Sequence, residues 1–263
     1  MSSDHILYLR KIKRNKYIIL FFQFFLLISL LFIWQYLTDK EIINSFISSS
    51  PIKVYNTIIS LHNSGNLYNH IWVTAYEIII SFILSMTIGI LVSMTLWWYD
   101  SLAKVLEPYL TVLNSLPKVA LGPILLIWCG ANIKTIIFMA ILVSIIVAIT
   151  NIYQGFMSAD TNKIKLIKSF GGTKRQLFWY LILPNSYKYI ISTLKLNISM
   201  CLIGVIMGEF LVSKEGIGYL IMNGSQVFNL NLVISGIILL GIIATMFYIA
   251  VCLIEKMIIR KKR

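Results

Sequence analysis

Charged residues are scarce in this sequence. Only 13% of its 263 residues are Asp, Glu, Lys or Arg, while 58% are hydrophobic; a soluble domain usually carries about 25% charged residues. The mean hydropathy is +0.83. This composition argues against an ordinary soluble protein. A chain of this length leaves room for one all-α domain of several membrane-spanning helices.

Acidic residues are the rarest charged class, with 10 Asp and Glu against 23 Lys and Arg. Such an excess of positive charge can indicate a nucleic-acid partner in a soluble protein. Here the basic residues lie in short stretches beside apolar runs, as the positive-inside rule describes for membrane proteins. We therefore expect contact with membrane lipid and no nucleic-acid partner.

Cysteine and histidine are also rare, with three residues of each. Cys129, Cys201 and Cys252 are far apart and show no metal-ligand or disulfide spacing, so we expect them to be small packing residues. None of the histidines falls in the middle of an apolar run. No metal site is predicted.

Motifs for nucleotide binding and hydrolysis are missing from the sequence. It has no Gly-x-x-x-x-Gly-Lys-Ser/Thr loop, and Gly171–Lys174 lacks the upstream glycine of one. It shows no Gly-x-Ser-x-Gly, no His-Glu-x-x-His and no pair of buried carboxylates. We therefore expect no catalytic residue, no cofactor and no ATP site in this chain.

Long apolar runs make up most of the chain, and a spanning helix needs roughly 20 apolar residues. Six spans are predicted: 17–37, 71–98, 105–129, 135–153, 189–207 and 232–254. Pro108, Pro117 and Pro123 should kink or interrupt the third span. Between the first two spans, Pro51 should begin a short external helix that follows an N-cap within Ser48–Ser50.

The distribution of Lys and Arg predicts the orientation of these spans. Seventeen fall in segments expected to be cytoplasmic and four in external ones, so both termini should be inside the cell. The expected parts are a basic N-terminus (1–16), a first span (17–37), an external segment (38–70), a five-helix core (71–256) and a basic tail (257–263).

A cytoplasmic loop, residues 158–188, is too long for a simple connection. It should form two short helices hinged at Gly171-Gly172, with Asp160 capping the first and Pro184 preceding the fifth span. Ile164, Ile167 and Phe170 recur at a spacing of three, which predicts one apolar face. This face either lies on lipid or docks a cytoplasmic partner.

Small and polar residues recur at helical spacing within three of the spans. Such stripes either line a pore or let helices approach closely, and packing is the more frequent role. The stripes are Ser81/Ser85/Gly89, Ser144/Ala148/Asn151 and Asn197/Cys201/Gly204.

Two lysines, Lys118 and Lys195, fall inside predicted spans, where a charge is costly unless it is paired or hydrated. Lys118 could line a pathway, extend to the membrane surface or pair with Glu107. Lys195 could do the same, or share a hydrated face with Ser192 and Ser199.

Several ordered motifs between about residues 50 and 225 resemble bacterial ABC importer permeases. Gly171 followed by Leu181-Ile182-Leu183-Pro184 matches the glycine and the hydrophobic-x-Leu-Pro end of that family's "EAA loop". Other segments are similar to its nitrate/sulfonate/taurine branch: Leu67–His70 with Thr74, Glu107-Pro108, Leu116–Pro123, Gly208–Phe210 and Gly216–Ile221.

Two departures from the family pattern are visible. Lys165-Leu166-Ile167 stands where the acidic-Ala-Ala part would fall. Glu77 occupies a position that is basic in many sulfonate-type relatives, and this variant looks more like relatives linked to uptake of pyrimidines, thiamine precursors or riboflavin.

The resemblance implies a type I importer permease in a bacterial plasma membrane. Two permease chains, identical or paired, would form one pore. Two cytoplasmic ATPase subunits would bind ATP, and an external binding protein would deliver a small organic or anionic solute. The coupling residues would be Asp160, Lys165, Leu166, Phe170, Gly171, Gly172, Thr173, Lys174 and Pro184. The pathway and gate residues would be Ser85, Gly89, Lys118, Asn151, Asn197, Glu209, Gly216 and Gly218.

Two other functional classes stay open. An intramembrane enzyme would need ionisable groups that converge at membrane depth. A structural or sensor protein would leave the hinged loop and the glycine-rich outer segment, 209–231, unexplained. The solute itself also stays open between sulfonate or nitrate and a pyrimidine, thiamine precursor or riboflavin.

Overall fold

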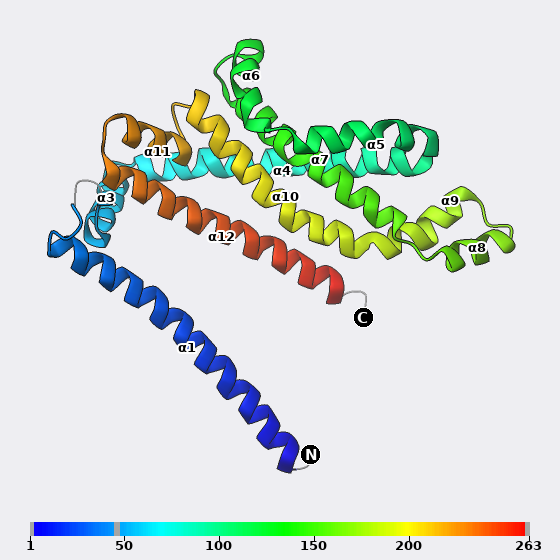
Figure 1. The fold of residues 1–263 in the computed structure, drawn as a ribbon, viewed down its shortest axis with the longest axis horizontal. Helices are drawn as coiled ribbons and strands as arrows, with labels where there is room; N and C mark the ends of the chain where they lie inside the picture. Colours follow the sequence, from blue (N-terminus) through cyan, green and yellow to red (C-terminus); the bar gives the residue numbers. More distant parts are fainter. Residues whose placement is uncertain (1–2, 45–47, 261–263) are drawn as a thin grey trace.

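The computed structural model describes residues 3–44 and 48–260, and every regular element in these ranges is a helix. The all-α prediction is therefore confirmed. Three of the predicted tail residues, 261–263, lie outside the described ranges. Figure 1 shows α4, α7, α10 and α12 running alongside one another, with α1 directed away from them.

Five helical segments in the described chain are long and apolar enough to cross a membrane. They belong to α1 (Ser3–Asp39), α4 (Asn66–Trp98), α7 (Ile133–Met157), the continuous helix 174–212 and α12 (Leu230–Arg260). The third predicted span, 105–129, is broken: α5 (Asp100–Ser115) meets the segment Lys118–Cys129 at 88°. The break falls at Pro117, because proline cannot continue the hydrogen-bonding pattern of α5.

The fifth predicted span, 189–207, is much longer than expected. It comprises α9 (Lys174–Leu177), a π-helical stretch, η2 (Phe178–Ile182), and α10 (Leu183–Val212). Pro184 follows the π-helical stretch after one residue, Leu183, whose N–H bonds to the Phe178 carbonyl oxygen; a π turn of this kind accommodates a local irregularity inside a continuous helix. The second half of the cytoplasmic loop is therefore the start of a spanning helix, and the prediction of a separate helix there was wrong.

The short helices begin where the capping residues predicted. Ser50 accepts a hydrogen bond from the Lys53 N–H at 3.3 Å, and α3 (Pro51–Asn63) follows it. Asp160 accepts one from the Asn162 N–H at 2.8 Å and caps α8 (Thr161–Ser169). The remaining short helices are α6 (Gly122–Cys129), which follows a 3-10 turn, η1 (Lys118–Leu121), and α11 (Ile217–Gln226).

Small residues bring α4, α7 and α10 into close contact. A Cβ atom added to Gly89 would lie 2.8 Å from Ala148 Cβ, and one added to Gly204 would lie 2.5 Å from Ala140 Cα. Both distances are too short for a real side chain. The small-residue stripes therefore pack helices together at these positions, which is the role the sequence favoured.

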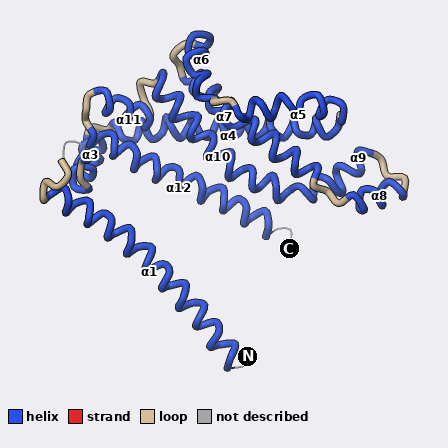
Figure 2. Tube along the Cα trace, viewed as in Figure 1, coloured by secondary structure: helices blue, strands red, loops and turns tan. Residues whose placement is uncertain are grey.

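Figure 2 shows that mostly short loops connect the helices. The loop with α8 and α9 lies at one end of the bundle, and α11 with α3 lies at the other (Figure 1). α1 contacts α3, and its most apolar stretch contributes no buried residue. The two ends of the bundle hold the candidate sites.

Candidate functional site

Both glycines of the hinge between α8 and α9 lie at positions that restrict larger residues, each for a different reason. Gly171 has φ of +75°, a left-handed conformation that favours glycine. A Cβ atom on Gly172 would lie 2.8 Å from the Ile167 carbonyl oxygen. Their N–H groups bond to the Lys168 and Ile167 carbonyl oxygens, both at 3.0 Å, which closes the end of α8.

The end of α8 has a buried side and an exposed side. Ile164 and Ile167 pack against the core cluster formed by α4, α7 and the start of the fifth span. Leu166 and Phe170 are 55% and 81% exposed. The spacing of three predicted that Phe170 shares the packed face of Ile164 and Ile167. That prediction was wrong, because Phe170 lies at the C-cap of α8, beyond its last helical turn.

The segment after the hinge is joined tightly to the bundle. Thr173 and Gln176 form a reciprocal capping box at the start of α9. The Lys174 ammonium donates to the Trp98 carbonyl oxygen at 2.7 Å. Phe178 is completely buried and packs on the rings of Trp97 and Phe156. The predicted coupling residues from Asp160 to Lys174 are thus one structural unit, whereas Pro184 lies exposed on α10.

At the opposite end, Glu209 of α10 holds the start of α11. Its buried carboxylate accepts hydrogen bonds from the Thr74 hydroxyl, at 2.6 Å, and from the Gly218 N–H. Thr74 also accepts from the Ile217 N–H at 2.8 Å. Gly216 has φ of +103°, and a Cβ atom there would collide with the Glu209 carboxyl group. Three predicted gate residues, Glu209, Gly216 and Gly218, are therefore in contact.

The outer cluster consists of His70, Thr74, Glu209, Gly216 and Gly218. Two of its members, His70 and Thr74, were not among the predicted site residues. Thr74 bridges two elements, and His70 Nδ1 accepts from the Gly216 N–H at 3.0 Å. Together with Glu77, they recur at helical spacing on one face of α4. That polar stripe was a visible pattern in the sequence, but it did not indicate which partner it meets.

Glu77 corrects the expectation that no buried carboxylates pair. Its side chain is completely buried. It lies three residues after Thr74 on the same face of α4, and Thr74 bonds to Glu209 at 2.6 Å, so the two carboxyl groups are neighbours. The pair does not form an accessible hydrolytic site, because neither residue is more than 1% exposed and Glu209 is occupied by its donors. The geometry therefore does not support an intramembrane enzyme.

The predicted pathway residues in the middle of the bundle lie between helices. Ser85 donates to Asn197 Oδ1 at 2.8 Å, and Asn197 Nδ2 donates to the Ser144 carbonyl oxygen at 3.3 Å. All three residues are buried. This polar cluster links α4, α7 and α10. Asn151 lies seven residues after Ser144 on α7, about two helical turns away, and is only partly buried.

Both lysines in the spans have partners that the sequence did not identify. Lys118 lies at the break after α5 and donates to the carbonyl and side-chain oxygens of Asn114, both at 3.4 Å, instead of pairing with Glu107. Lys195 forms an ion pair with Glu255 of α12 at 2.6 Å. Neither partner could be chosen from the sequence, because Glu255 is far away along the chain and Asn114 is one of several polar neighbours.

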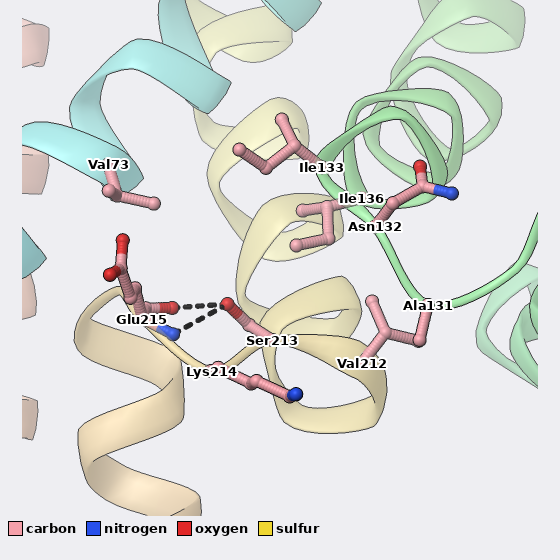
Figure 3. A pocket seen from close by; sticks show the side chains of 9 residues that line it. All are labelled: Val73, Ala131, Asn132, Ile133, Ile136, Val212, Ser213, Lys214 and Glu215. Carbon is pink, nitrogen blue, oxygen red and sulfur yellow. Dashed lines mark hydrogen bonds between the residues drawn. The ribbon is translucent and has the colours of Figure 1, made fainter.

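A cavity of about 270 Å³ opens beside the outer cluster (Figure 3). The loop after α10 contributes Ser213, Lys214 and Glu215, and the start of α7 contributes Ile133 and Ile136. Figure 3 shows the Ser213 hydroxyl bonded to the backbone of Glu215, which holds this loop in place. The cavity is lined by Val73, Ala131, Asn132, Ile133, Ile136, Val212, Ser213, Lys214 and Glu215.

Comparison with known proteins shows the family. Residues 85–263 match the model of the binding-protein-dependent transport system inner membrane component. The chain is 28% identical over 242 residues to the formylaminopyrimidine transport permease protein ThiX of Halalkalibacterium halodurans, covering 91% of this chain and 95% of the relative. It is 22% identical to the putative aliphatic sulfonates transport permease protein SsuC of Bacillus subtilis, over 87% and 83% of the two chains.

The fold is also similar to a solved structure. Inward-facing conformations of the MetNI methionine ABC transporter contain a chain with a TM-score of 0.64 and 16% identity, which covers 72% of this chain and 94% of that one. Proteins of this family work with ATPase subunits and a substrate-binding protein. The chain therefore belongs to the family of binding-protein-dependent transport system inner membrane components, and it is a multi-pass permease subunit of a bacterial ABC importer.

Proposed function

We propose that two copies of this permease form one pore, and that the unit Asp160–Lys174 docks into a cytoplasmic ATPase subunit. The exposed side chains of Leu166, on α8, and of Phe170, at its C-cap, carry this proposal, since Ile164 and Ile167 fix the other side of α8 to the bundle. Exposed apolar side chains such as these are stabilised when a partner protein covers them. Both chain termini would share the cytoplasmic side, as the positive charges favour.

Motion would pass from the docked unit to the outer cluster through a single helix. The continuous segment Lys174–Val212 has 39 residues, so it is about 58 Å long at 1.5 Å per residue. The hydrocarbon core of a membrane is only about 30 Å thick. The helix begins at the hinge and carries Glu209 near its other end. Closure of the ATPase subunits on ATP would thus tilt α10 and shift α11, a rigid-body form of alternating access.

The pathway would run along the faces of α4, α7 and α10 that meet the second copy, with Glu209, Gly216 and Gly218 at its outer gate. Asn151 and Lys118 are partly exposed and are the predicted pathway residues best able to contact solute. Ser85, Gly89 and Asn197 would act indirectly, since they hold the walls of the pathway together.

For the solute, we favour a formylaminopyrimidine-type thiamine precursor over an aliphatic sulfonate. The relative named for formylaminopyrimidine transport aligns with nearly the full length of both chains. The acidic Glu77, in a position that is basic in many sulfonate-type relatives, supports the same choice. Riboflavin, nitrate and sulfonates remain the competing solutes for the test.

The test is reconstitution of the permease with its ATPase and binding protein. The ATPase should co-purify with the permease, and thermal stabilisation of the binding protein should identify one solute in a panel of formylaminopyrimidines, flavins, nitrate and sulfonates. Proteoliposomes should then accumulate that solute only with ATP. Absence of co-purification would contradict the docking proposal, and stabilisation by sulfonates alone would contradict the solute.

A further inference from the structure

The buried carboxyl groups of Glu77 and Glu209 present an electrostatic problem. Glu77 lies three residues after Thr74 on the same face of α4, and Thr74 donates to Glu209 at 2.6 Å, so the two carboxyl groups are neighbours on facing helices. Both residues are buried, with exposed fractions of 0% and 1%. Two ionised carboxylates this close repel strongly where water does not screen them. The two ion pairs found in the described chain, Lys174–Asp100 and Lys195–Glu255, lie elsewhere and do not compensate this charge.

Hydrogen-bond donors are divided unequally between the two groups. Glu209 accepts from the Thr74 hydroxyl and the Gly218 N–H. Among the described residues, neither side-chain oxygen of Glu77 has a hydrogen-bond donor. An ionised carboxylate can only accept hydrogen bonds, whereas a protonated one can also donate. Burial of a charge with no donor is very costly, so the neutral, donating form suits Glu77 and the ionised form suits Glu209.

We propose that Glu77 and Glu209 form a buried proton-binding site, in which Glu77 holds one proton and donates it in a hydrogen bond to the Glu209 carboxylate. Among the described residues, no third His, Cys, Asp or Glu joins the pair to make a metal site. The backbone of Gly216 and Gly218 packs directly against the Glu209 carboxyl group, since a Cβ atom on either would collide with it.

The bound proton completes the set of donors that position Glu209. Glu209 in turn holds Gly218, and Thr74 holds Ile217, at the first residues of α11. Loss of the proton would leave two adjacent negative charges and weaken the attachment of α11 to the bundle. The consequence for transport rests on the proposed role of α11 as the outer gate; the proton site itself does not.

Other titratable groups at this end of the bundle have different contacts. His70, on α4, accepts from the Gly216 N–H. Glu215 and Lys214 are exposed on the loop before α11. Among the described residues, none of these three forms a hydrogen bond with Glu77. Glu215 therefore serves as a matched carboxyl control.

Infrared difference spectroscopy on the purified full-length chain tests the proton directly. The spectrum of the wild type minus that of Glu77→Gln should show the C=O stretch of a carboxylic acid, which shifts in D2O. The same difference for Glu215→Gln should show carboxylate bands instead. Carboxylate bands in the Glu77→Gln difference, or no acid band, would overturn the proposal. This measurement needs no transport, so it is independent of the proposed function.

Thermal unfolding provides a second measurement should Glu77→Gln fold poorly. Glu77→Gln keeps a neutral donor of similar shape, and its Tm is expected within about 2 °C of the wild type. Glu77→Leu has no donor and Glu209→Gln removes the anion, so both should show a larger decrease in Tm. If Glu77→Leu were as stable as Glu77→Gln, donation by Glu77 would be refuted. If neither variant folds, the wild-type spectrum alone is the test: a carboxylic acid band would support the proton site, and its absence would overturn the proposal.

Discussion

The Lys174 ammonium group bonds to the backbone carbonyl oxygen of Trp98, 2.7 Å away. The same group lies 3.7 Å from Asp100 Oδ1 and 5.4 Å from the centre of the Trp97 ring. The contact joins the first residue of α9, just after the hinge, to the junction of α4 and α5. Movement of the coupling unit must therefore carry this junction with it or break the contact.

Replacement of Lys174 should uncouple ATP hydrolysis from transport. Lys174→Met keeps the aliphatic stem but removes a charged hydrogen bond, which is worth about 1.5–3 kcal/mol. Transport in proteoliposomes should fall roughly tenfold, while ATPase binding and hydrolysis continue. Lys188→Met, which removes an exposed lysine of α10, is the control. Equal transport by both variants would show that the Lys174–Trp98 contact does not couple ATP hydrolysis to transport.

Whether a residue can replace Gly171 should depend only on how well that residue adopts a positive φ. No atom lies within 4 Å of a Cβ atom added to Gly171, so only its φ of +75° restricts the side chain. Asparagine tolerates this conformation far better than β-branched residues or proline. Gly171→Asn should retain the ATPase in a detergent pull-down, whereas Gly171→Pro and Gly171→Val should lose it. Insertion into the membrane should be normal in all three, and retention of the ATPase by Gly171→Pro would contradict the docking assignment.

Close helix packing predicts a large difference between two glycines in spanning helices. A Cβ atom on Gly204 would lie 2.5 Å from the backbone of Ala140, whereas one on Gly241 would meet nothing within 4 Å. Gly204→Val should destabilise the fold by about 1–3 kcal/mol or more through overpacking, and Gly241→Val should have little effect. Thermal unfolding in detergent measures both. Similar Tm values for the two variants would argue against the observed α7–α10 contact.

The Lys195–Glu255 ion pair should show coupling between α10 and α12. The two charges are 2.6 Å apart and their side chains are 29% and 24% exposed. Removal of one partner leaves the other charge uncompensated in a partly apolar site. Lys195→Met and Glu255→Gln should each lower Tm, and the double variant should be less destabilised than the sum of the two. Simple additivity in this double-mutant cycle would exclude an energetic link.

Local features of the sequence predicted local features of the fold. Ser50 and Asp160 predicted the starts of α3 and α8, because an N-cap acts on residues two or three positions away. The prolines predicted the broken third span, and Gly171-Gly172 predicted the hinge. The predicted extent of the fifth span was wrong. Pro184 resembles a boundary in the sequence, but the π-helical stretch before it lets the helix continue through it.

Among the candidate sites, the coupling unit could be located from the sequence because its residues are contiguous. The outer cluster could be named only in part. Glu209, Gly216 and Gly218 belong to one short segment and were predicted together, whereas His70, Thr74 and Glu77 come from a different helix. A periodic stripe on α4 shows that a polar face exists, but not what it faces.

The sequence by itself determined the membrane location, the number of apolar segments and the hinge in the cytoplasmic loop, because hydropathy, charge bias and glycine act over short distances along the chain. Only the tertiary structure decided which distant groups meet: Glu77 with Glu209, Lys195 with Glu255, and Lys174 with Trp98. Those contacts depend on the rotation and depth of whole helices against one another, and close packing at Gly89 and Gly204 sets both.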